Sequence, residues 1–493
     1  MRSPSDLSKT AQHSVIIGAG PGGYVAAIRL AQLTAGTDHK ITVIDKAPSF
    51  GGVCLNWGCI PSKSLIHAAS VYESMGDEAA LMGISTSKPT VDLPKMMAWK
   101  DGIVKQLTGG IAQLFKTHGI HTLQGEATFK DANTLSIKKP DGSIESLAFN
   151  QCLIATGSSS IAIPSAPLDG DVVITSNEAV NLQAIPKHLV VVGGGVIGLE
   201  LGVFYHKLGA QVTVVEMQSS ILPGMDTEIV KAMTRSLKKR GLNILTNTAL
   251  QSVSVAKGQA TVTIKTDAGT ETMTADKVLV AVGRKPNTGS LNLSAAGITA
   301  DAKGFIPTDD QLRTGKRHIF AIGDTTKPPL LAHKASKEGL VAAAVMAGGN
   351  DRLDVRAMPA AVFTDPEIAS VGLTEAEAIA KGLPIKVGTF PFAASGRALT
   401  MNAPEGMAKI IAHADTDEIL GVHMMGAHVA DLIGEAALGI ELGATAEDLA
   451  LTVHTHPTLA EVLMEAAEAV HNLAIHVAKP PSKKPASNTP ALV

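Results

Sequence analysis

A glycine-rich turn between an apolar strand and a helix occurs twice in this chain, and it is the feature that most constrains the fold. The first copy follows the apolar run 15–17, and the second follows the run 190–192. In such a turn the first glycine permits the tight bend, the second lets a pyrophosphate approach, and the third allows close helix packing. Two copies predict two dinucleotide sites. The glycines concerned are Gly18, Gly20 and Gly23, then Gly193, Gly195 and Gly198.

Each copy continues through a helix-like segment, 24–33 or 199–208, to a second apolar strand that ends in an acid. These acids are Asp45 and Glu216. Strand, helix and strand at this spacing form the βαβ unit of a parallel sheet. An acid at the strand end accepts hydrogen bonds from ribose hydroxyls and repels a 2′-phosphate, so Glu216 predicts NAD rather than NADP. The alternatives are a chance glycine turn in the first copy and a repeat without a ligand in the second.

Two of the three cysteines, Cys54 and Cys59, lie five residues apart just after the first unit. Pro61 suits the first turn of a helix. A helix N-terminus lowers the pKa of a nearby thiol and favours the reactive thiolate. Thiols that open and close as a disulfide beside a redox cofactor form a two-electron relay. The alternatives are two buried thiols or half of a metal site, but a metal site of this spacing needs partners elsewhere and only Cys152 remains, so no metal is expected.

The bulk composition excludes several classes of function. Lys and Arg number 42 and Asp and Glu 45, so a net charge of −3 offers no basic field for nucleic acid or anionic lipid. No apolar run reaches the roughly 18 residues that span a membrane. Three cysteines in 493 residues exclude a secreted disulfide scaffold. The first dozen residues are polar and lack a signal-peptide core, so we expect a cytoplasmic protein.

A further motif near the C-terminus joins His456 to Glu461. Pro457 suits the first turn of a helix that runs to about residue 470. Glu461 can then orient the imidazole and raise its basicity. The alternative is a histidine that caps the helix and a solvated glutamate. Three more charged residues follow these motifs, and the sequence around each one, considered by itself, favours a surface charge. They are Lys63, Glu200 and Asp324.

In this order, the motifs resemble the flavoprotein disulfide reductases over nearly the whole chain, most closely the dihydrolipoamide dehydrogenase (E3) family. The resemblance rests on the segments 54–63, 193–216, 318–324, 329–333 and 456–461. It implies FAD in the first fold and NAD in the second, with protein-bound dihydrolipoyl groups oxidised and NAD⁺ reduced. It also implies a homodimer whose partners are the lipoyl domain and core (E2) subunit of a 2-oxoacid dehydrogenase complex, or a glycine cleavage system.

The resemblance implies roles for single residues as well. Cys54 looks like the interchange thiol, and Cys59 looks like the thiol nearest the flavin. His456 looks like the base, oriented by Glu461 and donated by the second subunit. On the FAD side the resemblance points to Gly18, Gly20, Gly23, Asp45, Lys63, Ala127, Thr156, Gly157, Ser158, Asp324, Leu331, Ala332 and His333. On the NAD side it points to Gly193, Gly195, Gly198, Glu200, Glu216 and Gly283, with Lys63 and Glu200 as an ion pair.

The expected architecture is α/β, with a Rossmann-like NAD domain nested in a Rossmann-like FAD domain and an α/β dimerisation domain after them. We expect the FAD domain at 1–158 and 285–355, the NAD domain at 159–284, the dimerisation domain at 356–478 and a flexible tail at 479–493. Two residues depart from the family pattern: Asp45 is often glutamate, and Trp57 is often a small aliphatic residue.

Two competing hypotheses remain. A glutathione- or mercuric-reductase-like enzyme is disfavoured by Glu216 and by the lack of any cysteine after Cys152. A non-catalytic E3-like subunit is disfavoured because both paired cysteines and His456 are present.

Overall fold

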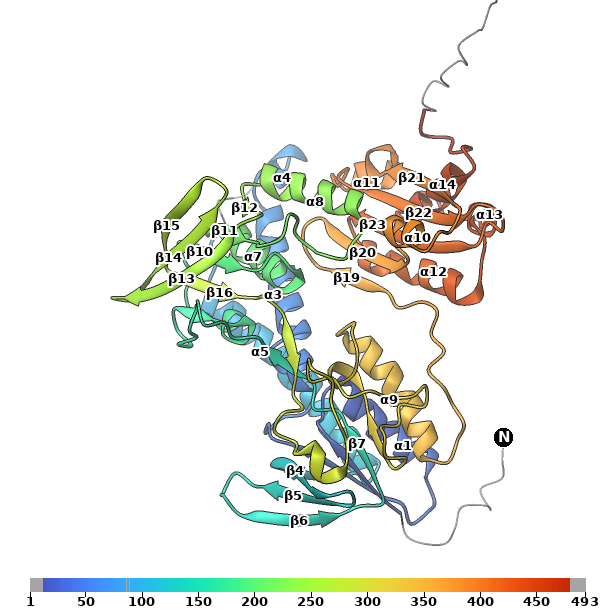
Figure 1. Ribbon diagram of the computed structural model, residues 1–493. Helices are drawn as coiled ribbons and strands as arrows, with labels where there is room; N and C mark the ends of the chain where they lie inside the picture. The colour runs from blue at the N-terminus through green and yellow to red at the C-terminus, as the bar shows by residue number, and fades with distance from the viewer. Residues whose placement is uncertain (1–11, 86, 88, 479–493) are drawn as a thin grey trace, which may run out of the picture. The chain divides into compact units, whose positions relative to one another are not determined.

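The computed structural model describes residues 12–478 except 86 and 88, so the tail expected at 479–493 lies outside the described residues. The chain forms two compact units (Figure 1). The first consists of Met1–Pro223 and Gly241–Asp354, and the second of Gly224–Arg240 and Val355–Val493.

The first unit begins with a parallel five-stranded sheet in the order β18-β7-β1-β2-β3. Its strands are β1 (His13–Ile17), β2 (Lys40–Asp45), β3 (His121–Gln124), β7 (Gln151–Ile154) and β18 (Ile319–Ala321). Apart from the polar edge strand β3, they are largely buried apolar runs because both faces of the sheet are covered. The helices α1 (Pro21–Leu33) and α9 (Ala332–Met346) pack together in the core on one face. The antiparallel strands β4 (Glu126–Asp131), β5 (Thr134–Lys138) and β6 (Ile144–Ala148) contribute to the core on the other.

A second parallel sheet in the same unit has the order β12-β11-β10-β16-β9. Its strands are β9 (Val173–Ile174), β10 (His188–Val192), β11 (Gln211–Val215), β12 (Asn243–Leu245) and β16 (Lys277–Val280), and α7 (Val196–Lys207) follows β10. An antiparallel meander of β13 (Ala249–Ala256), β14 (Gln259–Thr266) and β15 (Gly269–Ala275) completes its core.

The segment that forms the second sheet is inserted, as expected, between two strands of the first sheet. The chain leaves the first sheet after β7 and returns to it only at β18, which pairs with β7. The outgoing and returning segments pair as β8 (Ser158–Ser160) and β17 (Arg284–Pro286). The expected α/β class with two dinucleotide-type folds is therefore confirmed.

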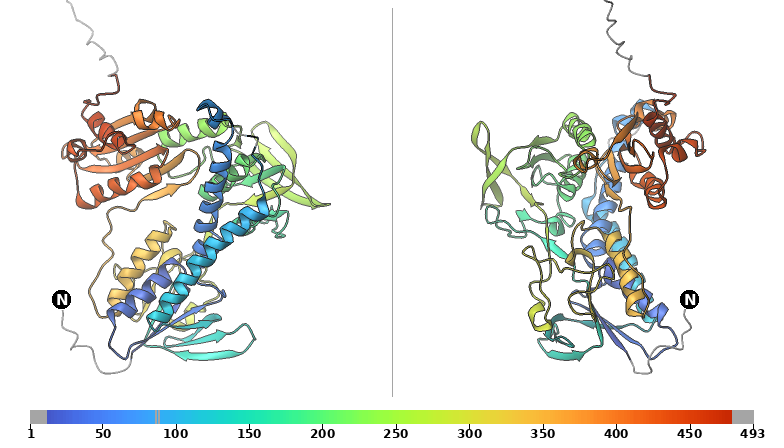
Figure 2. Two further views of the ribbon diagram at one scale, coloured as in Figure 1. Left: turned by 180° about the vertical axis from the view of Figure 1, so that it is seen from behind. Right: turned by 45° about the vertical axis from the view of Figure 1, so that its right-hand side comes forward.

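Further helices lie between strands of each sheet in the first unit. After β2 come α2 (Gly52–Asn56), α3 (Cys59–Ser74), α4 (Asp77–Leu81) and α5 (Leu93–Thr117), and α6 (Ser176–Ala179) follows β9. The long helix α5 packs along α3, as Figure 2 shows, and α3 also packs against α7. A buried lysine of α5, Lys100, donates to the carbonyl of Val180 and to Oδ1 of Asn181, which fixes α5 to the segment after α6.

The second unit is an antiparallel sheet in the order β19-β20-β23-β22-β21, packed against helices. Its strands are β19 (Ala360–Val362), β20 (Glu367–Gly372), β21 (Ile385–Pro391), β22 (Met407–His413) and β23 (Ile419–Gly426). Its helices are α8 (Thr227–Lys239), α10 (Glu375–Ala380), α11 (Gly396–Thr400), α12 (Val429–Leu442), α13 (Ala446–Leu451) and α14 (Glu461–Val470). The buried Lys409 of β22 binds Asp226, just before α8, and Glu375 of α10.

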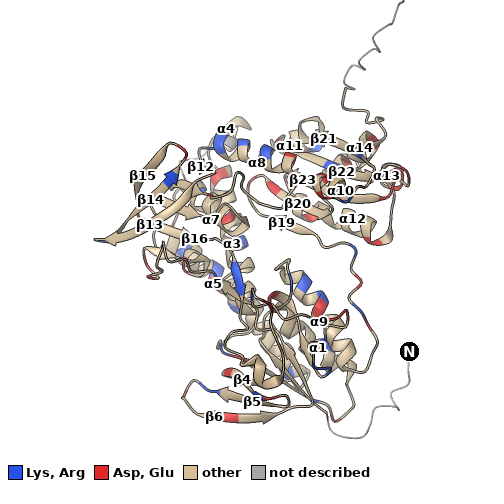
Figure 3. Ribbon diagram, viewed as in Figure 1, with Lys and Arg blue, Asp and Glu red and all other residues tan. Residues whose placement is uncertain are grey.

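Acidic and basic residues are interspersed along both units (Figure 3). In the part of the chain that the structure describes, no helix is long and apolar enough to cross a lipid bilayer.

Candidate functional site

The first glycine turn has the geometry that a pyrophosphate needs. Gly18 has a φ of +105°, and a Cβ there would lie 2.3 Å from the carbonyl oxygen of Ala155. A Cβ on Gly23 would lie 1.9 Å from the carbonyl oxygen of Gly18, so only glycine permits this approach of helix to strand. Gly20 is the N-cap of α1, and its helix start has no side-chain cap from the described residues. The first N–H groups of α1 therefore suit an anionic ligand, and the site fits the pyrophosphate of FAD.

The second glycine turn repeats this geometry. Gly193 has a φ of +104°, and a Cβ there would lie 2.5 Å from the carbonyl oxygen of Ala281. A Cβ on Gly198 would lie 2.3 Å from the carbonyl oxygen of Gly193. At Gly195, the N-cap of α7, a Cβ would meet no described atom within 4 Å, so there is room for a ligand at the helix N-terminus. The site fits a second dinucleotide.

The two strand-end acids make equivalent contacts despite their different lengths. The Asp45 carboxylate accepts from the backbone N–H groups of Ala19 at 2.7 Å and Ala47 at 2.9 Å. The Glu216 carboxylate accepts from Gly194 at 2.7 Å and Gln218 at 2.7 Å. Each acid therefore lies beside its own glycine turn, which is where a ribose would follow a bound pyrophosphate.

Two glycines bring the cysteine segment against the first turn. Gly51 and Gly52 have φ values of +97° and +59°, a conformation that glycine adopts without strain. The Gly51 N–H donates to the carbonyl of Ala19 at 2.8 Å. A Cβ on Gly52 would lie only 2.6 Å from the Cα of Gly20. This backbone contact places the thiols beside the first dinucleotide site.

The paired thiols lie on two helices, α2 and α3, that follow each other closely in the sequence. Cys54 is half-buried in α2, and Cys59 is the first residue of α3 and is exposed. Both are free thiols joined by a hydrogen bond between their side chains. Pro61 lies in the first turn of α3, as expected. The third cysteine, Cys152, is buried in β7, where burial raises the pKa of its thiol and makes it unreactive.

The hydrogen bond makes the two thiols chemically different. It is the main cause that raises the pKa of Cys54 far above the usual thiol value, and burial adds to the effect. The same hydrogen bond lowers the pKa of Cys59 to about 7, with help from the ammonium of Lys63, although desolvation by surrounding protein atoms opposes the shift. Near neutral pH the negative charge of the reduced pair is therefore on Cys59.

Lys63 and Glu200 are brought together by the packing of α3 on α7. Lys63 lies one turn after Cys59, and its Nζ is 2.6 Å from Oε2 of Glu200. The Glu200 side chain is 4 % exposed and that of Lys63 is 30 % exposed. The pair joins the thiol helix to the helix of the second glycine turn. Lys63 and Glu200 are therefore an ion pair between helices and not two separate surface charges.

Asp324 follows β18, an edge strand of the first sheet, and belongs to a hydrogen-bond network. Ser158 Oγ donates to Asp324 Oδ2 at 2.5 Å, and Arg284 donates to Ser158 Oγ at 2.8 Å and to the Ser158 carbonyl at 2.6 Å. Burial lowers the pKa of Arg284, while the charges of Asp324 and Cys59 oppose that shift. The guanidinium is therefore close enough to interact electrostatically with both groups. Arg284 was not among the expected site residues. Its place directly after Gly283, at a strand end, was the available signal.

The remaining expected FAD-side residues lie in the first unit. Leu331 is the N-cap of α9, and Ala332 and His333 open that helix, whose start has no side-chain cap among the described atoms. Thr156 is tied to Asn287 by a hydrogen bond from Oγ1 to the Asn287 carbonyl at 2.8 Å. Gly157 has a φ of +69°, and Ala127 is buried in β4. On the NAD side, Gly283 has a φ of +128°.

His456 and Glu461 form a hydrogen-bonded pair in the second unit. Glu461 is the first residue of α14, so the helix begins there and Pro457 lies in the loop before it, contrary to our expectation. The reason is that Glu461 Oε2 turns back to accept from the N–H of Thr458 at 2.8 Å, while Oε1 binds His456 Nδ1 at 2.9 Å. Burial raises the pKa of Glu461, but the Thr458 N–H and His456 outweigh it and hold that pKa below its usual value. The carboxylate is therefore charged, and Nε2 of the largely exposed imidazole is the nitrogen left for a substrate.

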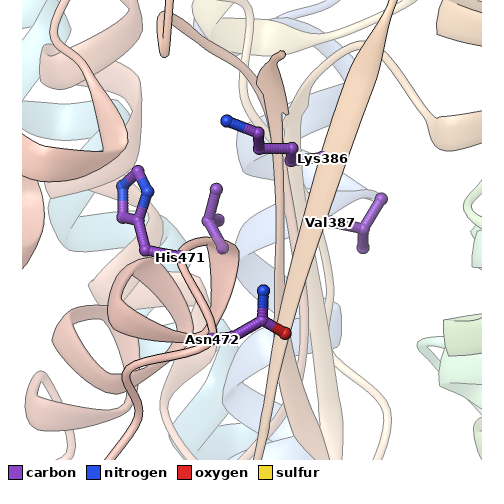
Figure 4. Close-up of a pocket in the computed structure, with 5 residues that line it drawn as sticks. Lys386, Val387, His471 and Asn472 are labelled. Atoms are coloured by element: carbon purple, nitrogen blue, oxygen red, sulfur yellow. The ribbon is translucent and has the colours of Figure 1, made fainter. Parts of the chain in front are cut away.

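A separate hollow of about 430 Å³ lies in the second unit, lined by Lys386, Val387, Val470, His471 and Asn472 (Figure 4). None of the expected site residues lines it. It is therefore distinct from the thiol pair and from the His456–Glu461 pair.

The first unit joins a dithiol to two nucleotide-type sites, which is the arrangement of a nucleotide-dependent dithiol–disulphide oxidoreductase. Comparison with known proteins agrees. Residues 12–339 match the family described as pyridine nucleotide-disulphide oxidoreductase, and residues 358–467 match its dimerisation domain. The chain belongs to the pyridine nucleotide-disulphide oxidoreductase family. The expected oxidoreductase class, the cofactors FAD and NAD, and a dimerisation domain that supports a homodimer are thereby confirmed.

Individual relatives are similar over nearly their full lengths. The chain is 46% identical to dihydrolipoyl dehydrogenase 3 of Haloarcula marismortui, covering 95% of this chain and 98% of that protein. It is 44% identical to dihydrolipoyl dehydrogenase of Geobacillus stearothermophilus, covering 94% and 97%. Among solved structures, LpdA from Mycobacterium tuberculosis superimposes with a TM-score of 0.86 at 29% identity, covering 93% of this chain and 99% of that one.

Proposed function

We propose that this protein is a dihydrolipoyl dehydrogenase, which oxidises protein-bound dihydrolipoyl groups to lipoyl groups and reduces NAD⁺ to NADH. The observation that carries the proposal is the asymmetric thiol pair, with Cys54 held protonated and Cys59 favoured as thiolate beside two nucleotide sites. The near-full-length similarity to dihydrolipoyl dehydrogenases supports the choice of substrate.

The asymmetry of the pair gives the direction of thiol exchange. A thiolate of the dihydrolipoyl group attacks Sγ of Cys54 in the Cys54–Cys59 disulfide, and Cys59 leaves because the thiol of lower pKa is the better leaving group. The second dihydrolipoyl thiol then attacks the first dihydrolipoyl sulfur, which is bonded to Cys54 in the mixed disulfide, and Cys54 is released. The substrate loses two electrons and two protons and becomes the lipoyl disulfide, and the two cysteines hold the electrons. This supports Cys54 as the interchange thiol.

The substrate thiol needs a base, and His456 has the chemistry for it. Its Nδ1 is held by the Glu461 carboxylate, which leaves Nε2 to accept the proton. Both residues lie within 358–467, the part that matches the dimerisation domain. We propose that the base serves the thiol pair of the second subunit in a homodimer.

When bound, FAD supplies a two-electron acceptor for the reduced thiols, and NAD⁺ supplies the final hydride acceptor. The chain's own residues position these groups. The turn Gly18–Gly23 with Asp45 would hold FAD, with Ser158, Asp324 and the start of α9 as further contacts, and the turn Gly193–Gly198 with Glu216 would hold NAD. Lys63 stabilises the Cys59 thiolate, and Glu200 fixes Lys63.

We further propose that the enzyme serves as E3 of a 2-oxoacid dehydrogenase complex, or of glycine cleavage, with a lipoyl domain and a core (E2) subunit as partners. The domain boundaries given above and the cytoplasmic location remain predictions.

The test follows NADH formation from NAD⁺ and dihydrolipoamide by the purified yellow protein. We expect turnover that disappears in C54S and that is at least about tenfold weaker with NADP⁺. The matched control is C152A, which removes the buried cysteine of β7 and should keep activity within about twofold, since that side chain is buried in the core and is not part of the thiol pair. A FAD-loaded protein that does not turn over dihydrolipoamide would refute the proposal. Glutathione disulfide or Hg²⁺ with NADPH then tests the alternative reductases.

A further inference from the structure

The helices that carry the two halves of the site run side by side and in the same direction. α3 begins at Cys59, and α7 begins at Val196, directly after the second glycine turn (Figure 1). Two polar bridges cross between them, one from Lys63 to Glu200 and the other from Ser70 to Lys207. In both bridges the residue numbers differ by 137, which requires parallel helices in one fixed register.

The second bridge is made by a buried lysine. The Lys207 side chain is 3 % exposed, and its Nζ lies 3.0 Å from Ser70 Oγ and 2.8 Å from Glu73 Oε2. Glu73 is 43 % exposed, so the pair joins a buried ammonium to a carboxylate near the surface. Burying an ammonium carries a large desolvation cost, which ion pairing often only offsets, so an apolar side chain would stabilise the interface equally well.

Apolar contacts lack the directionality of a charged hydrogen bond. Hydrophobic burial depends on area, so it resists separation of two helices more than sliding of one along the other. A lysine bound to two oxygens on the facing helix does resist sliding, because each distance must stay within hydrogen-bond range. Lys207 therefore provides what packing alone does not, a fixed axial position.

The spacing links this bridge to the reacting groups. Lys207 lies seven residues after Glu200, and Ser70 seven residues after Lys63. Seven residues are nearly two helical turns, about 10.5 Å. The Lys63–Glu200 distance of 2.6 Å is thus held from the far end of the same two helices. A displacement of about 1 Å at a reacting centre can reduce a rate by about 100-fold.

We propose that Lys207, with Ser70 and Glu73, is a positioning residue that sets the register of α7 on α3. Through Lys63 and Glu200 it fixes the spacing between the thiol helix and the helix of the second nucleotide site. The consequence for electron transfer rests on the proposed function, whereas the register itself does not.

The test compares K207M with K207R in the FAD-loaded full-length protein. K207M keeps an unbranched chain without the charge, and K207R keeps the charge and can still reach Ser70 and Glu73. The matched control is K139M, which breaks the Lys139–Glu145 pair at 2.6 Å, where both side chains are 36 % exposed. Such a surface pair contributes little to stability, because water screens both charges.

Two readouts are needed. Stopped-flow absorbance follows reduction of the enzyme by dihydrolipoamide and, separately, its reaction with NADH, which needs no disulfide substrate. We expect K207M to slow the NADH reaction by about tenfold or more while its reduction by dihydrolipoamide stays within about twofold. Amide hydrogen exchange should become about tenfold faster in α7, and α1 should be unchanged. K207R should restore both, and K139M should match the wild type.

The outcomes separate the two proposals. If the wild type reacts with NADH but not with dihydrolipoamide, the proposed substrate is wrong and the register test still stands. If K207M leaves both the NADH reaction and exchange in α7 unchanged, the positioning role is refuted. Equal slowing of both half-reactions, with a lower melting temperature and no rescue by K207R, would also refute it, because that pattern indicates general destabilisation.

Discussion

Replacing Cys54 with alanine should raise the pKa of Cys59, and the size of the effect follows from the structure. The pKa of Cys59 is about 7 against an ordinary value of 9.0, and the hydrogen bond from Cys54 is the largest cause. A hydrogen bond to a charged group contributes about 1.5–3 kcal/mol. Since one pKa unit corresponds to about 1.4 kcal/mol, loss of this bond should raise the pKa by about 1–2 units.

The thiolate population at neutral pH then falls steeply. With a pKa of about 7, roughly half of Cys59 is ionised at pH 7. A rise of about one unit leaves roughly 9 % ionised and a rise of about two units roughly 1 %, a decrease of about 5- to 50-fold. Because the acid is weakened, the thiolate of C54A should form only as the pH rises through about 8–9.

The assay is a pH titration of ultraviolet thiolate absorbance in the reduced, FAD-loaded protein, with C59S subtracted as background. Cys152 stays protonated because burial raises its pKa. The matched control is C54S, whose hydroxyl can still donate to Cys59. We expect C54S to titrate within about half a unit of the wild type. Titration of C54A near 7, or an equal shift in both variants, would refute the assignment of the thiolate to this hydrogen bond.

Three further predictions concern other parts of the site. H456Q should lower turnover with dihydrolipoamide by about 10²–10⁴-fold, with a much smaller effect on reaction of the enzyme with NADH, as measured by stopped flow. G52A should lower the FAD content per chain, because its Cβ would lie 2.6 Å from the Cα of Gly20. The control is G36A, where φ is +80° and the Cβ would meet no described atom within 4 Å. G36A should cost only about 1 kcal/mol of backbone strain and keep FAD. E216Q should raise the KM for NAD⁺ by about tenfold, because an amide replaces the carboxylate that would bind ribose, and an unchanged KM would exclude this contact.

Much of the fold and part of the site followed from local sequence. The two βαβ units and their nesting were predictable because turn glycines and continuous apolar strands have local steric requirements. The start of α14 was not, since Glu461 turns its side chain back to the Thr458 N–H instead of continuing a helix from Pro457. Arg284 was also missed, because its role depends on Ser158 and Asp324, both remote in the sequence.

The sequence by itself determined the chemistry available to this protein: two nucleotide turns, two thiols and an imidazole–carboxylate pair. Each is recognisable because its function requires particular residue types at short spacing. Only the tertiary structure decided which thiol carries the charge and how the thiol helix meets the second nucleotide helix. The first depends on one hydrogen bond and on Lys63, and the second on bridges between residues 137 apart in the chain. Contacts of this kind arise only when folding brings distant segments together, so no local pattern encodes them.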